Sequence, residues 1–200
     1  MLRNLHTMAD IVLFHHAQGQ TPGFHAFADT LRKAGHAVHT PDLFDGRTFS
    51  SIPEGLAYAD SIGFDAFQQR VDSLVSELPE ALVYSGFSIG VIHAQRLAQT
   101  RPYAKGALLF HSCLPHTESS PAWPEGVPVQ IHGMDHDPHF VDDGDIDAAR
   151  ELVAHAQSGE LFLYPGDQHC FADSSLTSYD PAAAALLESR TLAFLERLPA

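Results

Sequence analysis

The sequence is poor in cysteine, in basic residues and in long apolar runs. Its two cysteines, Cys113 and Cys170, lie far apart, so we expect two buried thiols in a reducing compartment rather than a disulfide. Lys and Arg total 11 against 25 Asp and Glu, and the net charge of −14 disfavours a nucleic-acid partner, because phosphate binding needs a basic face. No apolar stretch approaches the ~18 residues of a membrane span, and the N-terminus lacks the apolar core of a signal peptide. We therefore expect a cytoplasmic protein with no membrane partner.

Histidine, by contrast, is abundant, with 14 residues in a chain of 200. One cluster is His15-His16, and another places His132, His136 and His139 around two aspartates. Metal binding is one interpretation of such clusters. No Cys-x-x-Cys or His-Glu-x-x-His pattern supports it, so we expect no metal.

The segment Tyr84–Gly90 carries the pattern Gly-x-Ser-x-Gly. An apolar run at 81–84 predicts a buried strand before it, and a segment of helical period at 91–98, ended by Pro102, follows. Strand, pattern and helix together indicate a nucleophile elbow, a sharp turn that projects the serine oxygen clear of the sheet. The glycines leave room for the tight turn, and the helix points its free N–H groups at the reaction centre. We predict that Ser88 is the nucleophile.

Apolar strands and amphipathic helices alternate along the chain. Strands are expected at 11–14, 37–40, 81–84, 106–110, 127–132 and 161–164. Helices are expected at 21–35, 67–78 and 91–98, and onward from Asp145 and from Asp180. This alternation predicts one α/β domain over residues 1–200, with a mostly parallel sheet of about six to seven strands and helices on both faces. Functional groups are then expected in loops beyond the carboxyl ends of the strands.

Two segments are expected to form loops. Residues 45–61 mix Gly, Pro, Ser and Asp without a clear period, which favours a lid or a substrate-facing loop, although loops are also plain connections. Residues 111–125 form the second expected loop, and it contains Trp123.

A nucleophilic serine needs a base, and the base needs a third group that holds its tautomer and stabilises its charge. In α/β-hydrolases these groups follow in the order Ser, Asp or Glu, His. His169 lies in the short loop between the last expected strand and the last helix. Asp137 precedes Pro138 in a turn beyond the strand at 127–132, and Asp135 is the alternative acid. We predict the set Ser88, Asp137 and His169.

The oxyanion of the reaction needs hydrogen-bond donors that already point at the developing charge. The backbone N–H of Ile89, directly after the nucleophile, is one expected donor. The second is expected in the loop after the first strand, at Ala17, with His16 as the fallback.

With these residues in place, the chain resembles the dienelactone hydrolase family of α/β-hydrolases. The Pro-Asp-Leu-aromatic step after the second strand and the His-x-Phe motif after the last strand are its more specific features. The matching segments, spread over most of the length, are Ile11–Leu13, Thr40–Phe44, Gly86–Gly90, Asp137–Val141, His169–Phe171 and Arg190–Leu195. The resemblance implies a cofactor-free hydrolase of one domain without a cap domain, with Ala17 and Ile89 as the oxyanion donors.

Three positions depart from the family pattern. The well-known members carry a cysteine nucleophile where this chain has Ser88, and a glutamate near the resting thiol where it has His16. A serine does not need control of a thiol, so these two changes are consistent with each other. The members also carry an arginine for the substrate carboxylate where this chain has Asp173, which would repel a carboxylate at close range.

The expected function is hydrolysis of carboxylic esters or lactones through an acyl-serine intermediate. A small open pocket is expected, lined by His16, Phe140, Phe171 and Trp123, although these aromatics would serve equally well as core residues. The expected partner is a small-molecule ester or lactone, and the protein is expected to be a monomer or homodimer.

Three alternatives remain open at this stage. An acyltransferase or thioesterase would use the same three residues. A ligand-binding protein would keep the pocket without turnover. A metal-dependent hydrolase would use the histidines between His132 and His139, and it would lose its activity with a chelator.

Overall fold

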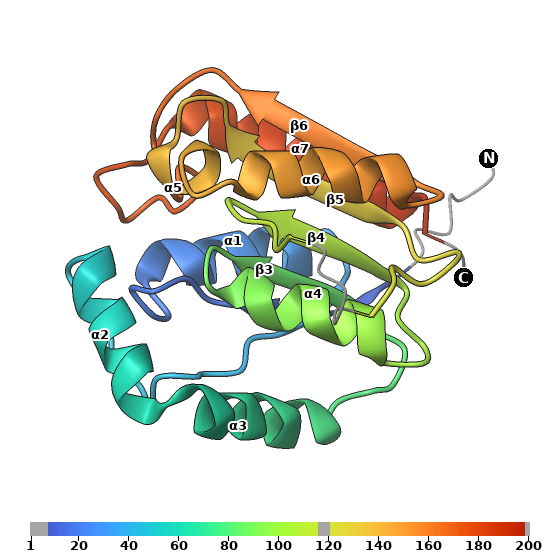
Figure 1. Cartoon of the computed structure of the whole chain (residues 1–200), viewed down its shortest axis with the longest axis horizontal. Helices are drawn as coiled ribbons and strands as arrows, with labels where there is room; N and C mark the ends of the chain where they lie inside the picture. Colours follow the sequence, from blue (N-terminus) through green and yellow to red (C-terminus); the bar gives the residue numbers. More distant parts are fainter. Residues whose placement is uncertain (1–7, 116–120, 199–200) are drawn as a thin grey trace.

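A single six-stranded sheet forms the centre of the protein (Figure 1). The computed structural model describes residues 8–115 and 121–198. The strands are β1 Asp10–Phe14, β2 Ala37–His39, β3 Val83–Phe87, β4 Gly106–Phe110, β5 Val129–Met134 and β6 Gly159–Tyr164. Their order is β2-β1-β3-β4-β5-β6, and every neighbouring pair is parallel. The predicted mostly parallel sheet of about six to seven strands is confirmed.

Helices cover both faces of this sheet (Figure 1). They are α1 Pro22–Lys33, α2 Ile52–Ile62, α3 Phe64–Ser76, α4 Gly90–Thr100, α5 Pro138–Val141, α6 Asp145–His155 and α7 Pro181–Glu196. Buried side chains of α1 and α7 form one core layer with one face of the sheet. Buried side chains of α3, α4 and α6 form the second layer with the other face. The sheet is therefore buried on both sides, as parallel sheets require.

Two helices begin at caps that the sequence predicts. The Thr21 side chain accepts a hydrogen bond from the Phe24 N–H at 3.2 Å, and Pro22 occupies the first turn of α1. At α7, Asp180 accepts from two backbone N–H groups, each at 3.0 Å. These bonds satisfy donors that a helix start otherwise leaves without a partner.

The central strand β3 lies further along the chain than its apolar residues indicate. It runs from Val83 to Phe87 and so includes Ser85 and Gly86. The Ser85 hydroxyl donates to the backbone oxygen of Val12 at 2.8 Å, which satisfies this polar group inside the core. An apolar run alone therefore misplaces the end of the strand.

The expectation of a loop over residues 45–61 is wrong from residue 52 onward, where α2 begins. Ser51 caps this helix by accepting from the Glu54 N–H, and the Glu54 carboxylate accepts in return from the Ser50 backbone N–H. Gly55 is the one buried residue among the 11 of this helix, and Tyr58, Ala59 and Ile62 pack against the core while partly buried. This inward face has helical spacing, but the Gly, Pro, Ser and Asp content of the segment favoured a loop.

Two expectations drawn from composition concern cysteines and membranes. Cys113 and Cys170 are both buried and neither forms a disulfide, which confirms the predicted pair of buried thiols. Within residues 8–115 and 121–198, no helix has both the length and the apolar character needed to cross a bilayer.

Candidate active site

Ser88 lies on a sharp turn between β3 and α4. Its φ is 52°, in the left-handed region, and its N–H donates to the Phe110 carbonyl at 2.8 Å. A Cβ at Gly86 would lie 2.4 Å from the carbonyl carbon of Gly90, and one at Gly90 would lie 2.7 Å from the Phe14 oxygen. Both glycines are therefore required for this close packing of backbone. The turn has the strained geometry of a nucleophile elbow.

The structure brings Ser88, His169 and Asp137 together in a chain of hydrogen bonds. His169 Nδ1 lies 2.6 Å from Asp137 Oδ2, and His169 Nε2 lies 2.8 Å from Ser88 Oγ. A carboxylate accepts only, so Nδ1–H donates to Asp137 and Nε2 is free to accept from the serine hydroxyl. Asp137 is fully buried and also caps α5 by accepting from the His139 N–H at 3.0 Å. The carboxylate is thus held from two sides.

Asp135, the alternative acid, lies apart from His169. Its Oδ1 accepts from the Gly166 N–H at 3.1 Å and from His136 Nδ1–H at 2.6 Å. The hydrogen bond from His136 lowers the pKa of Asp135, and the bond from the Gly166 backbone adds to this effect. Its role in the structure is to hold the turn after β6, and Asp137 alone of the two contacts His169.

Opposing effects act on the pKa of His169. Burial alone would lower it, since the charged form loses its solvation. Interactions with the adjacent Cys170 side chain and the hydrogen bond to the Asp137 carboxylate outweigh burial, so the pKa of His169 is raised above the ordinary 6.5. The neutral form needed to accept the Ser88 proton therefore becomes dominant only at higher pH.

The loop after β1 is held in place by two histidine side chains. His15 Nε2 accepts from the Leu43 N–H at 3.1 Å, so its Nδ1–H donates to the His16 carbonyl at 2.8 Å. His16 Nδ1 in turn accepts from the Gln18 N–H at 3.2 Å. Both imidazoles serve the backbone of this loop, and burial lowers the pKa of His15 to about 4.

Asp173 anchors the same loop from the carboxyl-terminal side. Its Oδ2 accepts from His16 Nε2–H at 2.8 Å and from the Thr21 hydroxyl, and its Oδ1 accepts from the Ser175 N–H at 2.8 Å. Burial works to raise its pKa, but the hydrogen bonds from His16, Ser175 and Thr21 outweigh burial and lower the pKa to about 2. The carboxylate faces the start of α1 and does not line the cavity beside Ser88. In this geometry, Asp173 is therefore not placed to repel a substrate carboxylate at close range, as the sequence had led us to expect.

Two backbone N–H groups near the serine have no hydrogen-bond acceptor within the part of the chain that the structure describes. The N–H groups of Gln18 and Gly19 are bonded to His16, whereas that of Ala17 has no acceptor there. The N–H of Ile89, after Ser88, likewise has none. These are the two expected oxyanion donors. Ile89 lines the cavity beside Ser88, whereas Ala17 is buried and is not among the described lining residues.

A cavity of about 180 Å³ opens beside Ser88 and His169. Apolar side chains of α2 and α4 form one wall, namely Ile52, Leu56 and Ile92. Polar residues form the opposite wall, namely His111, Ser112, His139, Asp143 and Asp145. Part of the segment 45–61 therefore lines this cavity, but as helix α2.

The four expected pocket residues are not among the described residues that line this cavity. Phe140 is fully buried and lies so close to Gly133 that a Cβ there would be 2.5 Å from its ring. Phe171 is also fully buried, with its ring edge-on to that of His111. His16 is turned toward Asp173. The packing of Phe140 and Phe171 therefore supports their alternative role as core residues.

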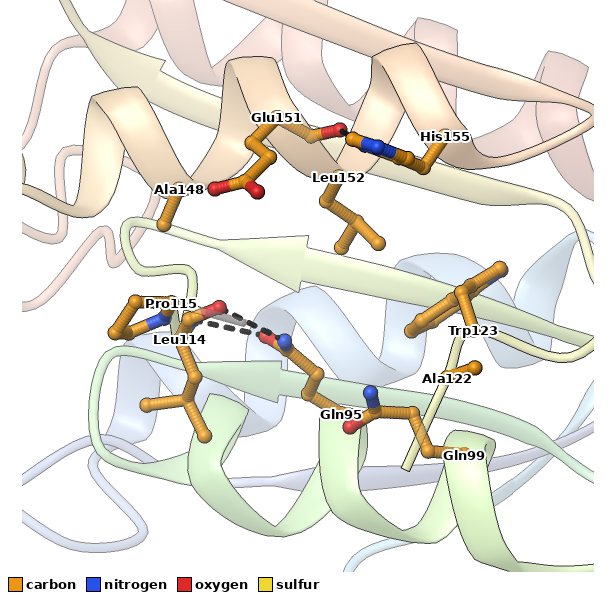
Figure 2. A pocket seen from close by; sticks show the side chains of 10 residues that line it. All are labelled: Gln95, Gln99, Leu114, Pro115, Ala122, Trp123, Ala148, Glu151, Leu152 and His155. Atoms are coloured by element: carbon orange, nitrogen blue, oxygen red, sulfur yellow. Dashed lines mark hydrogen bonds between the residues drawn. The ribbon is translucent and has the colours of Figure 1, made fainter. Parts of the chain in front are cut away.

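Trp123 lines a different, larger cavity of about 380 Å³ between α4 and α6 (Figure 2). Its indole N–H donates to the Val127 carbonyl at 2.8 Å, which fixes the ring on that side. Leu114 lines both cavities and so forms the wall between them. The Gln95 amide holds this wall by accepting from the Leu114 N–H at 2.9 Å and donating to its carbonyl at 3.0 Å.

His111 is a residue of the site that the sequence did not single out. It is fully buried, has a φ of 65°, and within the described chain neither ring nitrogen has a hydrogen-bond partner. Its ring stacks on Phe87 and lies 5.9 Å, between centroids, from the ring of His169. Burial holds its pKa well below 6.5, so the ring is neutral. Its position directly after β4 is the signal that could have found it.

The histidines of the suspected metal cluster do not converge. His132 is buried and bonded to the Tyr164 hydroxyl and to Gln130, whereas His136 is exposed and bonded to Asp135. His139 lies beside His169, with 4.7 Å between ring centroids. Across the residues that the structure describes, no group of three potential ligands is placed to hold a metal ion.

Comparisons with known proteins agree with this architecture. The model of the dienelactone hydrolase family matches residues 4–198. The comparison with curated proteins gave no match. Among solved structures, that of a putative dienelactone hydrolase from Klebsiella pneumoniae superposes with a TM-score of 0.72 at 19% identity, covering 95% of this chain and 87% of that one.

Two further solved structures share the fold. A dienelactone hydrolase-like promiscuous phosphotriesterase from metagenomic libraries has a TM-score of 0.77 at 20% identity, covering 95% of this chain and 86% of that one. A putative hydrolase of the α/β superfamily from Xanthomonas campestris has a TM-score of 0.64 at 18% identity, covering 94% of this chain and 97% of that one.

Proposed function

Because the chain belongs to the dienelactone hydrolase family, we propose that it is a serine hydrolase of carboxylic esters or lactones. The observation that carries this proposal is the pair of contacts made by His169, 2.8 Å to Ser88 Oγ and 2.6 Å to Asp137. A hydroxyl bonded to an imidazole, which is itself bonded to a buried carboxylate, is the arrangement that activates serine nucleophiles.

In the first half of the proposed reaction, Ser88 attacks the ester carbonyl as His169 Nε2 takes its proton. Asp137 stabilises the imidazolium that forms and keeps Nδ1 protonated. The N–H groups of Ile89 and Ala17 stabilise the negative charge on the carbonyl oxygen by hydrogen bonds. His169 then gives its proton to the departing alcohol, which leaves an acyl group on Ser88.

In the second half, water attacks the acyl-serine. His169 takes a proton from this water, and the tetrahedral oxyanion forms again at the same two N–H groups. As it collapses, the bond to Ser88 Oγ breaks and His169 returns the proton to this oxygen, which releases the acid and restores both residues. No other group on the chain has to change its protonation state. The proposed cycle therefore needs no cofactor.

The test is the mass of the intact protein after exposure to a fluorophosphonate probe, together with hydrolysis of short p-nitrophenyl esters. We expect a single adduct and measurable turnover in the wild type, and neither in Ser88→Ala. Ser73→Ala, an exposed serine of α3, is the matched control and should behave as the wild type. Retained hydrolysis in Ser88→Ala would overturn the mechanism.

Variations of this assay separate the alternative functions. Turnover that rises when an alcohol acceptor is added would favour acyl transfer, and faster cleavage of thioesters than of oxygen esters would favour a thioesterase. Loss of turnover with a chelator would point to a metal-dependent reaction. Binding without adduct or turnover would leave a ligand-binding protein.

A further inference from the structure

The described lining of the cavity beside Ser88 contains two aspartates and no Lys or Arg. Its three histidines include His169, whose charge when protonated is paired with the Asp137 carboxylate at 2.6 Å. Asp143 and Asp145 both line it, on either side of Gly144 at the start of α6. None of the 11 Lys and Arg residues of the chain is among the described residues that line it. A positively charged group in this cavity would meet complementary charge, and a negatively charged group would be repelled.

The Asp145 carboxylate is fixed in this wall. Its Oδ2 accepts from the Ser112 hydroxyl at 2.6 Å and from the Cys113 N–H at 3.1 Å. Both partners follow β4 directly, on the side where the proposed reaction takes place. Because both contacts are donors to the carboxylate, the group is held as a hydrogen-bond acceptor. Burial raises the pKa of Asp145 above its ordinary value, and the two hydrogen bonds and the nearby His169 act in the opposite direction.

Asp143 is more exposed than Asp145 and lies beside His139. Its Oδ2 lies 3.8 Å from His139 Nδ1, and the His139 ring lies 4.7 Å from that of His169. The charge preference of the cavity is measured at pH 8, where carboxylates are ionised. His169 keeps a raised pKa in this range, and its positive charge is paired with Asp137.

An independent feature of the same cavity also points to a polar ligand. His111 lines it, is fully buried, and has no hydrogen-bond partner for either ring nitrogen within the described residues. A buried polar group without a hydrogen-bond partner is uncommon and calls for an explanation. A polar group of a bound ligand that forms the missing hydrogen bond is one such explanation.

The larger cavity across Leu114 has the same character. Glu151 and Trp123 line it, and the described lining again contains no Lys or Arg. Figure 2 shows Glu151 on the side of α6 that faces Leu114, with Trp123 at the other end of the cavity. A carboxylate and an indole face are both groups that attract organic cations.

We propose that this site selects esters in which the acyl or the alcohol part carries a positive charge, such as a quaternary ammonium group. Asp143 and Asp145 are the specificity-determining residues, and Glu151 extends the same charge to the neighbouring cavity. The proposal rests on the proposed function, because it assigns a substrate class to the same serine site.

The test compares esters of one shape and different charge at pH 8 and low salt. The first pair is a choline ester and its carbon isostere, in which a tert-butyl group replaces the trimethylammonium group; a second pair carries the same two groups at the end of the acyl chain. A carboxylate-bearing ester completes the set. We expect kcat/KM for a cationic ester to exceed that for its neutral isostere roughly tenfold, and this ratio to fall with added salt.

Variants assign the preference to named residues. Asp143→Asn and Asp145→Asn should each lower the ratio of cationic to neutral kcat/KM several-fold. Asp142→Asn removes the same charge from the neighbouring exposed position, which lines neither cavity, and should keep the wild-type ratio. Equal rates for the cationic and neutral esters, a preference for the carboxylate ester, or a ratio unchanged in both cavity variants would overturn the proposal.

Calorimetry on Ser88→Ala separates this inference from the proposed function. Tighter binding of the cationic ester than of its isostere is expected there, where no turnover can occur. If that preference appears but the wild type hydrolyses no ester, the hydrolase proposal fails and the charge selectivity stands. If the wild type turns over esters without a charge preference in rate or binding, the selectivity alone fails.

Discussion

Gly55 of α2 rests directly on the carbonyl of Ala17. A Cβ at position 55 would stand 1.7 Å from that oxygen and 2.5 Å from the carbonyl carbon, so only glycine allows this approach. Its neighbours Ile52 and Leu56 line the cavity beside Ser88. One helix therefore both lines the cavity and contacts the carbonyl of Ala17, the residue whose N–H is the proposed second oxyanion donor.

The contact predicts a specific effect of Gly55→Ala. The methyl group must displace either α2 or the Ala17 peptide, and the loss of one oxyanion donor typically costs about a hundredfold or more in kcat. We expect kcat for a p-nitrophenyl ester to fall by roughly that factor. Alanine is the better helix former by about 1 kcal/mol, so helix propensity alone would change α2 in the opposite sense.

Ala57→Gly is the control for this prediction. Ala57 is exposed on the same helix, and glycine there weakens α2 without touching Ala17. Its kcat should stay close to that of the wild type. Equal losses in the two variants would mean that α2 stability, and not the position of Ala17, limits the reaction.

The raised pKa of His169 predicts an acid limb in the pH dependence of activity. The base must be neutral, so kcat/KM for a neutral ester should rise with pH and have its midpoint above 6.5. In Asp137→Asn the carboxylate that favours the imidazolium is gone, so the midpoint should move down and the rate should fall by about three to four orders of magnitude.

Asp135→Asn is the matched control for the acid. Asp135 accepts hydrogen bonds from Gly166 and His136 and forms none with His169 in the described structure, so the midpoint of the acid limb should be unchanged. A midpoint that moves with Asp135 and stays with Asp137 would reverse the assignment of the acid.

Sequence patterns located the proposed chemistry better than they located the cavity. Ser88, Asp137 and His169 were accessible because each follows a strand of a parallel sheet, and such ends converge. The cavity walls depend on contacts between segments far apart in the chain. Trp123 lines the neighbouring cavity instead, because its place follows from where the connection after β4 packs between α4 and α6.

The same limit applies to α2 and to Asp173. The inward face of α2 consists of one glycine and the partly buried Tyr58, Ala59 and Ile62, so its periodic signal is weaker than that of a helix with large, fully buried side chains. Asp173 follows His169 by four positions, but whether its carboxylate faces a substrate or α1 depends on Thr21 and His16, which lie about 150 positions earlier. The spacing of residues along the sequence determines neither the presence of α2 nor the direction in which the Asp173 carboxylate faces.

Asp173 should contribute strongly to stability. Its folded pKa of about 2 lies below the ordinary 3.8, so the contribution is present above pH 3.8 and is lost as the pH falls toward 2. The shift corresponds to about 2 kcal/mol of unfolding free energy. We expect Asp173→Asn to lose about this amount by urea unfolding, equally at pH 7 and pH 8. Asp167→Asn, an exposed carboxylate in the preceding turn, should lose little.

Four buried histidines should make the protein sensitive to mild acid. Burial lowers the pKa of His15 and His93 to about 4 and that of His132 to about 3, and holds that of His111 well below 6.5. Below pH 6.5 these four histidines become protonated in the unfolded chain but stay neutral in the folded protein, so stability falls as the pH drops. His169 adds nothing in this window, because its raised pKa leaves it protonated in both states.

Four such protons correspond to a slope of about 5 kcal/mol per pH unit between pH 6 and pH 5, measured by urea unfolding at closely spaced pH values. His93 is the variant to test, because it packs between the rings of Phe14 and Phe67 with no hydrogen-bond partner in the described chain. His93→Leu should remove about a quarter of the slope and, by deleting an unsatisfied buried polar group, raise stability at pH 7 by about 1 kcal/mol. A slope that is the same in wild type and variant would mean that His93 is protonated in the folded protein, against the burial that its surroundings impose.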